Sequence, residues 1–177
     1  MVDLSLRILD LLEHSLRAGA SIISVMVHEK RKEDRLEVTI EDNGTSASAT
    51  PSTAPDHGTD KGKSLGIRQF KATAEQAGGS LQLGKSPLGG ALVKATMQLS
   101  HVDRVPLGDL ASMLSSVVCT NPEVDLWFTV RVDAQEACVK VSEVATEVAP
   151  SDRCGLAVAR RVSERIKACV EKTGVVG

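Results

Sequence analysis

The chain has 177 residues, which is enough for one compact domain or for one domain with a small appendage. Hydrophobic residues make up 42% of it and aromatic residues only 2%, so the core is expected to be aliphatic. The formal net charge is −2, from 21 basic and 23 acidic residues, which leaves no electrostatic case for nucleic acid or an anionic membrane as the main partner.

The cysteines and the N-terminal segment indicate the cellular compartment in which the protein is expected. The four cysteines contain no Cys-x-x-Cys pair, so a zinc site is not expected. Asp3, Arg7 and Asp10 interrupt the first apolar run, which argues against a signal peptide, and no apolar stretch reaches membrane-spanning length. The sequence therefore predicts a cytoplasmic protein with reduced, buried thiols and no membrane partner.

The first part of the chain predicts a helix followed by a hairpin. Residues 3–18 carry leucine and isoleucine at helical spacing, with Asp3 as the N-cap. Residues 21–27 and 36–41 are rich in β-formers, and the charged segment 28–35 between them predicts a hairpin connection.

A long polar segment follows the second strand. Asp42-Asn43-Gly44 is a turn signal, and residues 45–64 are rich in Ser, Thr, Ala, Pro and Gly. A connection of about 20 residues is far longer than usual, so we expect a mobile loop that is either functional or disordered. A glycine turn at Gly62–Gly66 then leads into an amphipathic helix over 67–77.

Two further strands complete the first half of the chain. They are expected over residues 80–83 and 91–99, with a hairpin turn at 85–90. Hairpin-joined strands alternating with helices indicate an antiparallel or mixed sheet with helices on one face. The predicted fold class is therefore α+β, a two-layer α/β sandwich.

Pro106 marks a break, after which a second set of elements is expected. These are a helix, two strands joined as a hairpin and a final amphipathic helix, over residues 107–118, 124–130, 136–141 and 153–171. The sequence therefore predicts one domain over residues 1–104, with a lid at 45–64, and a small α+β subdomain over 105–177 that is packed against it.

The glycine turn is also a candidate anion site. Small residues at a helix N-terminus leave backbone N–H groups unpaired, and these groups and the positive end of the helix dipole suit a phosphate. Lys61 and Lys63 add positive charge beside them.

Three segments of the first hundred residues resemble motifs of one superfamily, in the same order. They are Ile8–Ala20, Glu41–Gly44 and Gly62–Ile67. The first resembles the opening helix motif, the second an Asp-x-Gly box and the third a Gly-x-Gly-Leu-Gly-Leu box of the GHKL superfamily. This superfamily shares the ATP-binding domain of gyrase B, sensor histidine kinases and mismatch-repair ATPases. The resemblance covers residues 3–99 and implies the histidine-kinase-like ATPase fold.

The opening segment also resembles a narrower group, the small stand-alone members found near iron-only hydrogenase genes. They share the pattern LSLxILDxxExSxRAGAS and a segment like residues 99–109. The resemblance therefore extends across the junction between the two predicted regions.

The resemblance implies a role for each matched position. Asp42 would accept a hydrogen bond from the adenine amino group, Gly44 would let the base approach the backbone, and Ala18 would pack beside the base. Asp10 would be the water-activating carboxylate, and His14 occupies the position of a magnesium ligand. The phosphates would be bound by the remaining box, which is Gly62, Lys63, Ser64, Leu65 and Gly66.

Four positions depart from the superfamily pattern. His14 replaces the magnesium-binding Asn, and an imidazole is a poor ligand for magnesium, which prefers oxygen. Ser64 replaces the middle glycine of the phosphate box, Ser46 the second glycine of the Asp-x-Gly-x-Gly box, and Ala91 a usual Thr. The pattern suggests a weakened or lost ATPase on a retained fold, with ATP bound and magnesium doubtful.

These observations lead to one function with two alternatives. The first is an ATP-binding regulatory or accessory protein with a protein partner of unspecified identity, which would hydrolyse ATP or transfer its terminal phosphate slowly. The second is a degenerate pseudo-ATPase that acts as a protein-interaction module. The third is an anti-sigma-type serine kinase.

Overall fold

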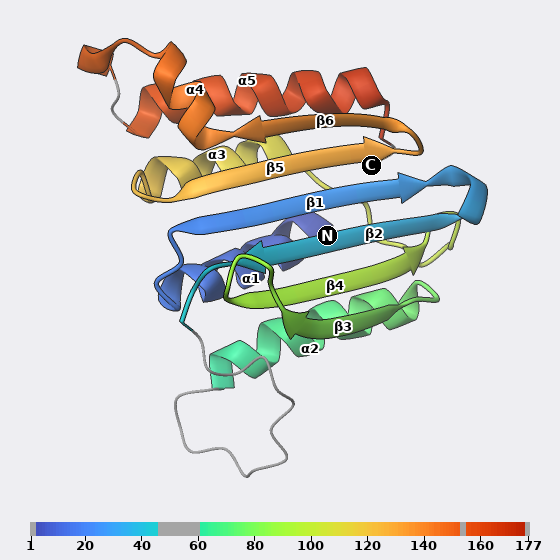
Figure 1. Cartoon of the computed structure of the whole chain (residues 1–177). Coiled ribbons are helices and arrows are strands. Elements are labelled where there is room, and N and C mark those ends of the chain that lie inside the picture. The colour runs from blue at the N-terminus through green and yellow to red at the C-terminus, as the bar shows by residue number, and fades with distance from the viewer. Residues whose placement is uncertain (1–2, 46–60, 153–154, 176–177) are drawn as a thin grey trace.

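The protein is described by a computed structural model that covers residues 3–45, 61–152 and 155–175, without the side chains of 61–64 and Asp152 (Figure 1). Its six-stranded sheet has the order β3-β4-β2-β1-β5-β6. The strands are β1 (Ile22–Lys30), β2 (Arg35–Asp42), β3 (Ser80–Lys85), β4 (Ala91–Gln98), β5 (Asp125–Val132) and β6 (Gln135–Lys140). The helices are α1 (Leu4–Arg17), α2 (Lys61–Gln76), α3 (Leu110–Thr120), α4 (Val141–Glu147) and α5 (Gly155–Thr173), with short 3₁₀ turns η1 (Arg31–Glu33) and η2 (Pro150–Asp152).

The sheet is mixed. Neighbouring strands are antiparallel except β1 and β5, which run parallel from the pair Ile22 and Asp125 to the pair Glu29 and Val132. Buried positions alternate along β1 and β5, as they must when one face of a sheet packs on a core. Four helices cover that face, and neighbouring contacts order them as α2-α1-α3-α5 (Figure 1). The predicted α+β two-layer sandwich is confirmed.

Helix α1 begins where the sequence predicts. Asp3 is the N-cap, and its Oδ1 accepts a hydrogen bond from the backbone N–H of Leu6 at 3.2 Å. The N–H of Leu4, which has no partner inside the helix, donates to the carbonyl of Pro106 at 2.9 Å. The start of α1 is thereby held by the segment that connects β4 to α3.

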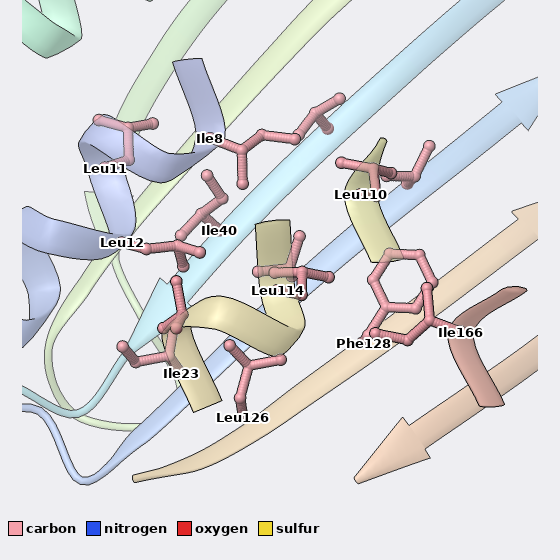
Figure 2. Close-up of a cluster of buried hydrophobic side chains, with 14 of the residues drawn as sticks. Ile8, Leu11, Leu12, Ile23, Ile40, Leu110, Leu114, Leu126, Phe128 and Ile166 are labelled. Carbon is pink, nitrogen blue, oxygen red and sulfur yellow. The ribbon is translucent and has the colours of Figure 1, made fainter. Parts of the chain in front are cut away.

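The core is continuous across the two predicted regions. One buried cluster contains Ile8 and Leu12 from α1 together with Leu114 from α3 and Phe128 from β5 (Figure 2). It is mainly aliphatic, as expected, although both Phe residues of the chain are fully buried in it. The division predicted between residues 104 and 105 lies in the connection between β4 and α3, and the second region extends the sheet through β5 beside β1.

Three boundaries differ from those predicted. Helix α2 begins at Lys61, so the glycine segment 62–66 forms its first turns and is not a turn ahead of it. Strand β1 continues to Lys30, which shortens the hairpin connection. Residue Val141, expected at the end of a strand, begins α4. The carboxylate of Asp125 accepts from the N–H of Ser142 at 2.8 Å, and this long-range contact stabilises the start of α4.

The expectation of buried thiols is wrong for one cysteine. Cys138 is exposed, whereas Cys119 and Cys169 are half-buried, and all three are free. The apolar stripe of the last helix does pack against the core, through Val158, Val162 and Ile166 among others. Among the helices that the structure describes, none is long and apolar enough to cross a membrane.

Candidate functional site

Asp42 is the last residue of β2, and its side chain points into the helical layer. Leu36, Val38 and Ile40 alternate on that face of the strand, so position 42 falls on it as well. The residue is only 3% exposed, and its carboxylate accepts three hydrogen bonds from described residues. Oδ1 accepts from the N–H of Gly44 at 2.9 Å and of Ala91 at 3.1 Å.

The third donor is Ser15, a residue to which the motifs assign no role. Its hydroxyl donates to Oδ2 of Asp42 at 2.5 Å, and the serine is itself buried. Ser15 lies three and four residues after Leu12 and Leu11 on the buried face of α1. A serine beside Leu11 and Leu12 on the buried face of the helix needs a polar partner, so this position was the signal in the sequence.

Two glycines allow the backbone to close tightly around Asp42. A Cβ on Gly90 would lie 2.2 Å from Oδ1 of Asp42 and 2.6 Å from its carbonyl oxygen. A Cβ on Gly44 would lie 3.0 Å from Cβ of Ala18. Ala18, Gly44 and Asp42, which were predicted as adenine-contacting residues, are therefore brought together at one point.

Asn43 fixes the turn after β2. Its Oδ1 accepts from the N–H groups of Ser21 and Ile22, each at 2.9 Å, and its own N–H donates to the carbonyl of Ile22 at 3.2 Å. At the start of β1, the Asn43 side chain thus accepts hydrogen bonds that a neighbouring strand would otherwise accept. The residue between Asp42 and Gly44 has a structural task that the motif analysis did not assign.

Asp10 lies where α1 crosses α2. A Cβ on Gly66 would be 3.4 Å from Cβ of Asp10, so the glycine permits the close approach of the two helices. The Asp10 carboxylate is 45% exposed and lies 3.8 Å from Nη1 of Arg7. Nη1 of Arg7 also donates to Oε1 of Gln69 in α2 at 2.5 Å. The structure therefore brings Asp10 and Gly66 together, one on each helix.

The rest of the predicted phosphate box stays a prediction. The backbone of Gly62, Lys63 and Ser64 is helical, and their side chains lie outside the described part. The side chain of Leu65 is exposed, at 56%. Residues 46–60, which include most of the predicted lid and Ser46, also lie outside the described residues.

His14 lies one turn after Asp10 on α1 and is half-buried. Within residues 3–45, 61–152 and 155–175, no group of three or more His, Cys, Asp or Glu side chains is arranged to hold a metal ion. An imidazole nitrogen is a poor ligand for magnesium, which requires an octahedral set of oxygens. His14 as a metal ligand stays a prediction.

A dense charge cluster lies on the opposite face of the sheet, away from Asp42. Glu37 accepts from Nζ of Lys30 at 3.0 Å, and Nζ of Lys94 lies 3.3 Å from its other oxygen. Burial alone would raise the pKa of Glu37, but the hydrogen bonds and charges of the two lysines outweigh burial and hold its pKa below its usual range. This cluster stabilises the fold and lies outside the candidate site.

A hollow of about 180 Å³ lies between the start of α3 and the end of α5. It is lined mainly by apolar residues, together with Asp109, Lys167 and Glu171. None of its lining residues belongs to the candidate site, so the hollow and the Asp42 cluster are separate features.

Comparison with known proteins gives structural likenesses alone, since no protein-family model and no curated protein matches the chain. The Aquifex aeolicus MutL ATPase domain complexed with ADP superposes with a TM-score of 0.40 at 17% identity, over 75% of this chain and 60% of that one. The N-terminal domain of a DNA repair protein gives a TM-score of 0.45 at 13% identity, over 77% and 52%. The chain thus spans less than two thirds of either structure, and TM-scores this low identify neither a family nor a function.

Proposed function

We propose that the chain is a nucleotide-binding module, an ATP-binding regulatory or accessory protein of the histidine-kinase-like type. The observation that carries the proposal is the convergence of Asp42, Ala18 and Gly44 at one point. The point where α1 crosses α2, at Asp10 and Gly66, lies nearer the start of the same helix α1. The motif resemblance implies that Asp42, Ala18 and Gly44 contact the base, that Gly66 belongs to the phosphate box and that Asp10 is the water-activating carboxylate.

The acceptor capacity of Asp42 is consistent with binding of a base. A carboxylate offers about four lone-pair positions. Ser15, Gly44 and Ala91 occupy three of them among the described residues. The fourth would accept from a single donor such as the exocyclic amino group of adenine. A hydrogen bond from that group to an ionised carboxylate contributes about 1.5–3 kcal/mol.

The phosphate end of the proposed site would be formed by the start of α2. The first N–H groups of a helix have no partner within the helix, and the helix dipole adds positive potential there. In Figure 1 the start of α2 lies at the same end of the sheet as the end of β2. Asp10, which is half-exposed, would orient a water or hydroxyl nucleophile if the terminal phosphate is transferred.

One observation favours a second candidate, a degenerate pseudo-ATPase that acts as an interaction module. Asp42 is almost fully buried, and its three partners tie α1, the end of β2 and the start of β4 together. A purely structural role accounts for these contacts without any ligand. The two candidates differ in whether Asp42 also accepts a hydrogen bond from a nucleotide.

Calorimetric titration of the full chain with ADP and ATP, with and without magnesium, separates the two candidates. The test variant is Asp42→Asn, which keeps the shape of the side chain. Its amide oxygen can still accept from Gly44 and Ala91, and its amino group can donate to Ser15. That amino group would then face the adenine amino group, so binding should be lost while the fold is kept.

Asp34→Asn is the matched control because Asp34 flanks the other end of β2. Its carboxylate accepts from Ser100 and Gln98, and its left-handed φ of 50° is one that Asn adopts readily. Nucleotide binding that survives in Asp34→Asn and disappears in Asp42→Asn supports the proposed site. Absence of binding to the wild-type chain at millimolar nucleotide would leave the interaction module as the function.

A further inference from the structure

Arg7 lies between α1 and α2, beyond Asp10 as seen from Asp42. Nη1 donates to Oε1 of Gln69 at 2.5 Å and lies 3.8 Å from Oδ2 of Asp10. The side chain is only 19% exposed. Its Nε is buried and has no hydrogen-bond partner among the residues that the structure describes. The guanidinium is therefore held in place with part of its donor capacity unused.

Among the described residues, the guanidinium of Arg7 has no hydrogen bond to an anion. A guanidinium carries five N–H donors and stays charged at any physiological pH. Gln69 is neutral, and the Asp10 carboxylate is beyond hydrogen-bonding distance at 3.8 Å. A buried donor without a partner destabilises the folded chain. An oxyanion that reached the Nη groups would give the guanidinium the hydrogen-bonded anionic partner that Asp10, at 3.8 Å, does not supply.

The position of Arg7 along α1 indicates which part of a nucleotide it would meet. Arg7, Asp10, His14 and Ala18 follow one another at intervals of three and four residues, so they form one stripe along the helix and its C-cap. At about 1.5 Å per residue, Arg7 lies roughly 16 Å from Ala18 along the axis. Ala18 packs beside Gly44, where the base is proposed to bind, so Arg7 lies at the opposite, phosphate end of the stripe.

We infer that Arg7 contacts the terminal phosphate of a bound nucleoside triphosphate and makes the site prefer ATP over ADP. Gln69 is the positioning residue, since it holds the guanidinium between the two helices. The planar fork of an arginine matches a phosphate with two parallel N–H···O bonds. This role rests on the proposed nucleotide site, because it needs the base to bind at Asp42.

The test compares the affinities for ATP and ADP by calorimetric titration of the full chain. Arg7→Gln should weaken ATP binding about tenfold or more, because a hydrogen bond to a charged group contributes about 1.5–3 kcal/mol, and should leave ADP binding unchanged. Gln69→Ala should weaken ATP binding in the same direction by a smaller factor. Arg17→Gln is the matched control, since Arg17 lies on α1 with its side chain 60% exposed and pairs with Glu13.

The outcomes separate this role from the proposed function. An ATP-to-ADP preference that falls in Arg7→Gln and stays in Arg17→Gln supports the role of Arg7. Equal effects on ATP and ADP, or none, overturn it; the nucleotide site itself then stands if ADP binding still disappears in Asp42→Asn. A wild-type chain that binds neither nucleotide overturns both. If Arg7→Gln does not fold, Gln69→Ala decides by the same criterion, because it releases the guanidinium without removing its charge.

Discussion

The hydroxyl of Ser15 donates a 2.5 Å hydrogen bond to Oδ2 of Asp42 and thereby ties the last turn of α1 to the end of β2. The two residues are 27 positions apart in the sequence and both are buried. Any nucleotide that binds at Asp42 would meet a carboxylate already oriented by this bond. Under the proposed function, the pair would contribute to stability and to nucleotide binding.

Replacing Ser15 by alanine should destabilise the fold. The change leaves one oxygen of a buried carboxylate without its donor, which costs about 1–3 kcal/mol. Urea unfolding followed by circular dichroism measures the difference. Ser116→Ala is the control, because that hydroxyl is exposed and, among the described residues, donates to the carbonyl of Ser112 within α3. Equal unfolding midpoints for the two variants would show that the Ser15–Asp42 bond does not stabilise the fold.

Gly90→Ala should disrupt the site and the fold together. The added Cβ would lie 2.2 Å from Oδ1 of Asp42 and 2.7 Å from the backbone nitrogen of Gly44, so the backbone must move. Overpacking of this kind costs about 1–3 kcal/mol or more. Gly84→Ala is the control in β3, where the Cβ would meet Leu92 at an ordinary 3.9 Å. Thermal melting compares them, and a Gly90→Ala melting temperature no lower than that of Gly84→Ala would contradict the geometry.

The chain should unfold in one cooperative transition. Leu12 in α1 and Phe128 in β5 belong to the same buried cluster, and β5 pairs with β1. The fluorescence of Trp127, the single tryptophan, reports on β5, whereas far-ultraviolet circular dichroism reports on the whole chain. The two urea curves should coincide.

Leu12→Ala extends this test to the predicted division after residue 104. Leu12 is fully buried, so the substitution should cost about 2–5 kcal/mol. The Trp127 transition should shift by as much as the circular dichroism transition. Two separated transitions, with only one of them shifted, would instead support an independently folding C-terminal subdomain.

Glu37→Gln should destabilise the fold at neutral pH and lose its effect in acid. The pKa of Glu37 is lower in the folded chain than its ordinary value of 4.5, because Lys30 and Lys94 outweigh the effect of burial. The ionised carboxylate therefore stabilises the fold, fully so above the unfolded-state pKa, and this contribution is lost as the pH falls through the folded-state pKa.

The measurement is the free energy of unfolding of wild type and Glu37→Gln between pH 7 and pH 3. At pH 7 the variant should be less stable by about 1 kcal/mol or more, since it loses hydrogen bonds between charged groups. The difference should shrink below about pH 4.5. Glu75→Gln serves as control because Glu75 pairs with Lys71 on the exposed side of α2. A Glu37→Gln deficit that does not change with pH would contradict the assigned cause.

Local pattern predicted most of the elements. The spacing of Leu4, Ile8, Leu11 and Leu12 determines a helix with one apolar face, and the alternation of Leu36, Val38 and Ile40 determines a strand with one buried face. The same alternation placed Asp42 on the core side of β2. The α+β class follows from such short-range regularities, whereas the grouping of Asp42, Gly44 and Ala18 was implied by the resemblance of the motifs.

Contacts between distant residues decided the rest. The start of α4 depends on Asp125, and the parallel pairing of β5 with β1 depends on a crossover that no local pattern records. The partner of Ser15 could be predicted to exist, because a buried hydroxyl requires one, but its identity as Asp42 could not. The hydrogen bond between Arg7 and Gln69, 62 residues later, also depends on how the folded chain packs α1 against α2. The sequence determines by itself which side chains are apolar, charged or conformationally free, because those properties are local. Only the packing of helices on the sheet decides which polar groups meet, because burial and hydrogen-bond geometry are properties of the folded chain.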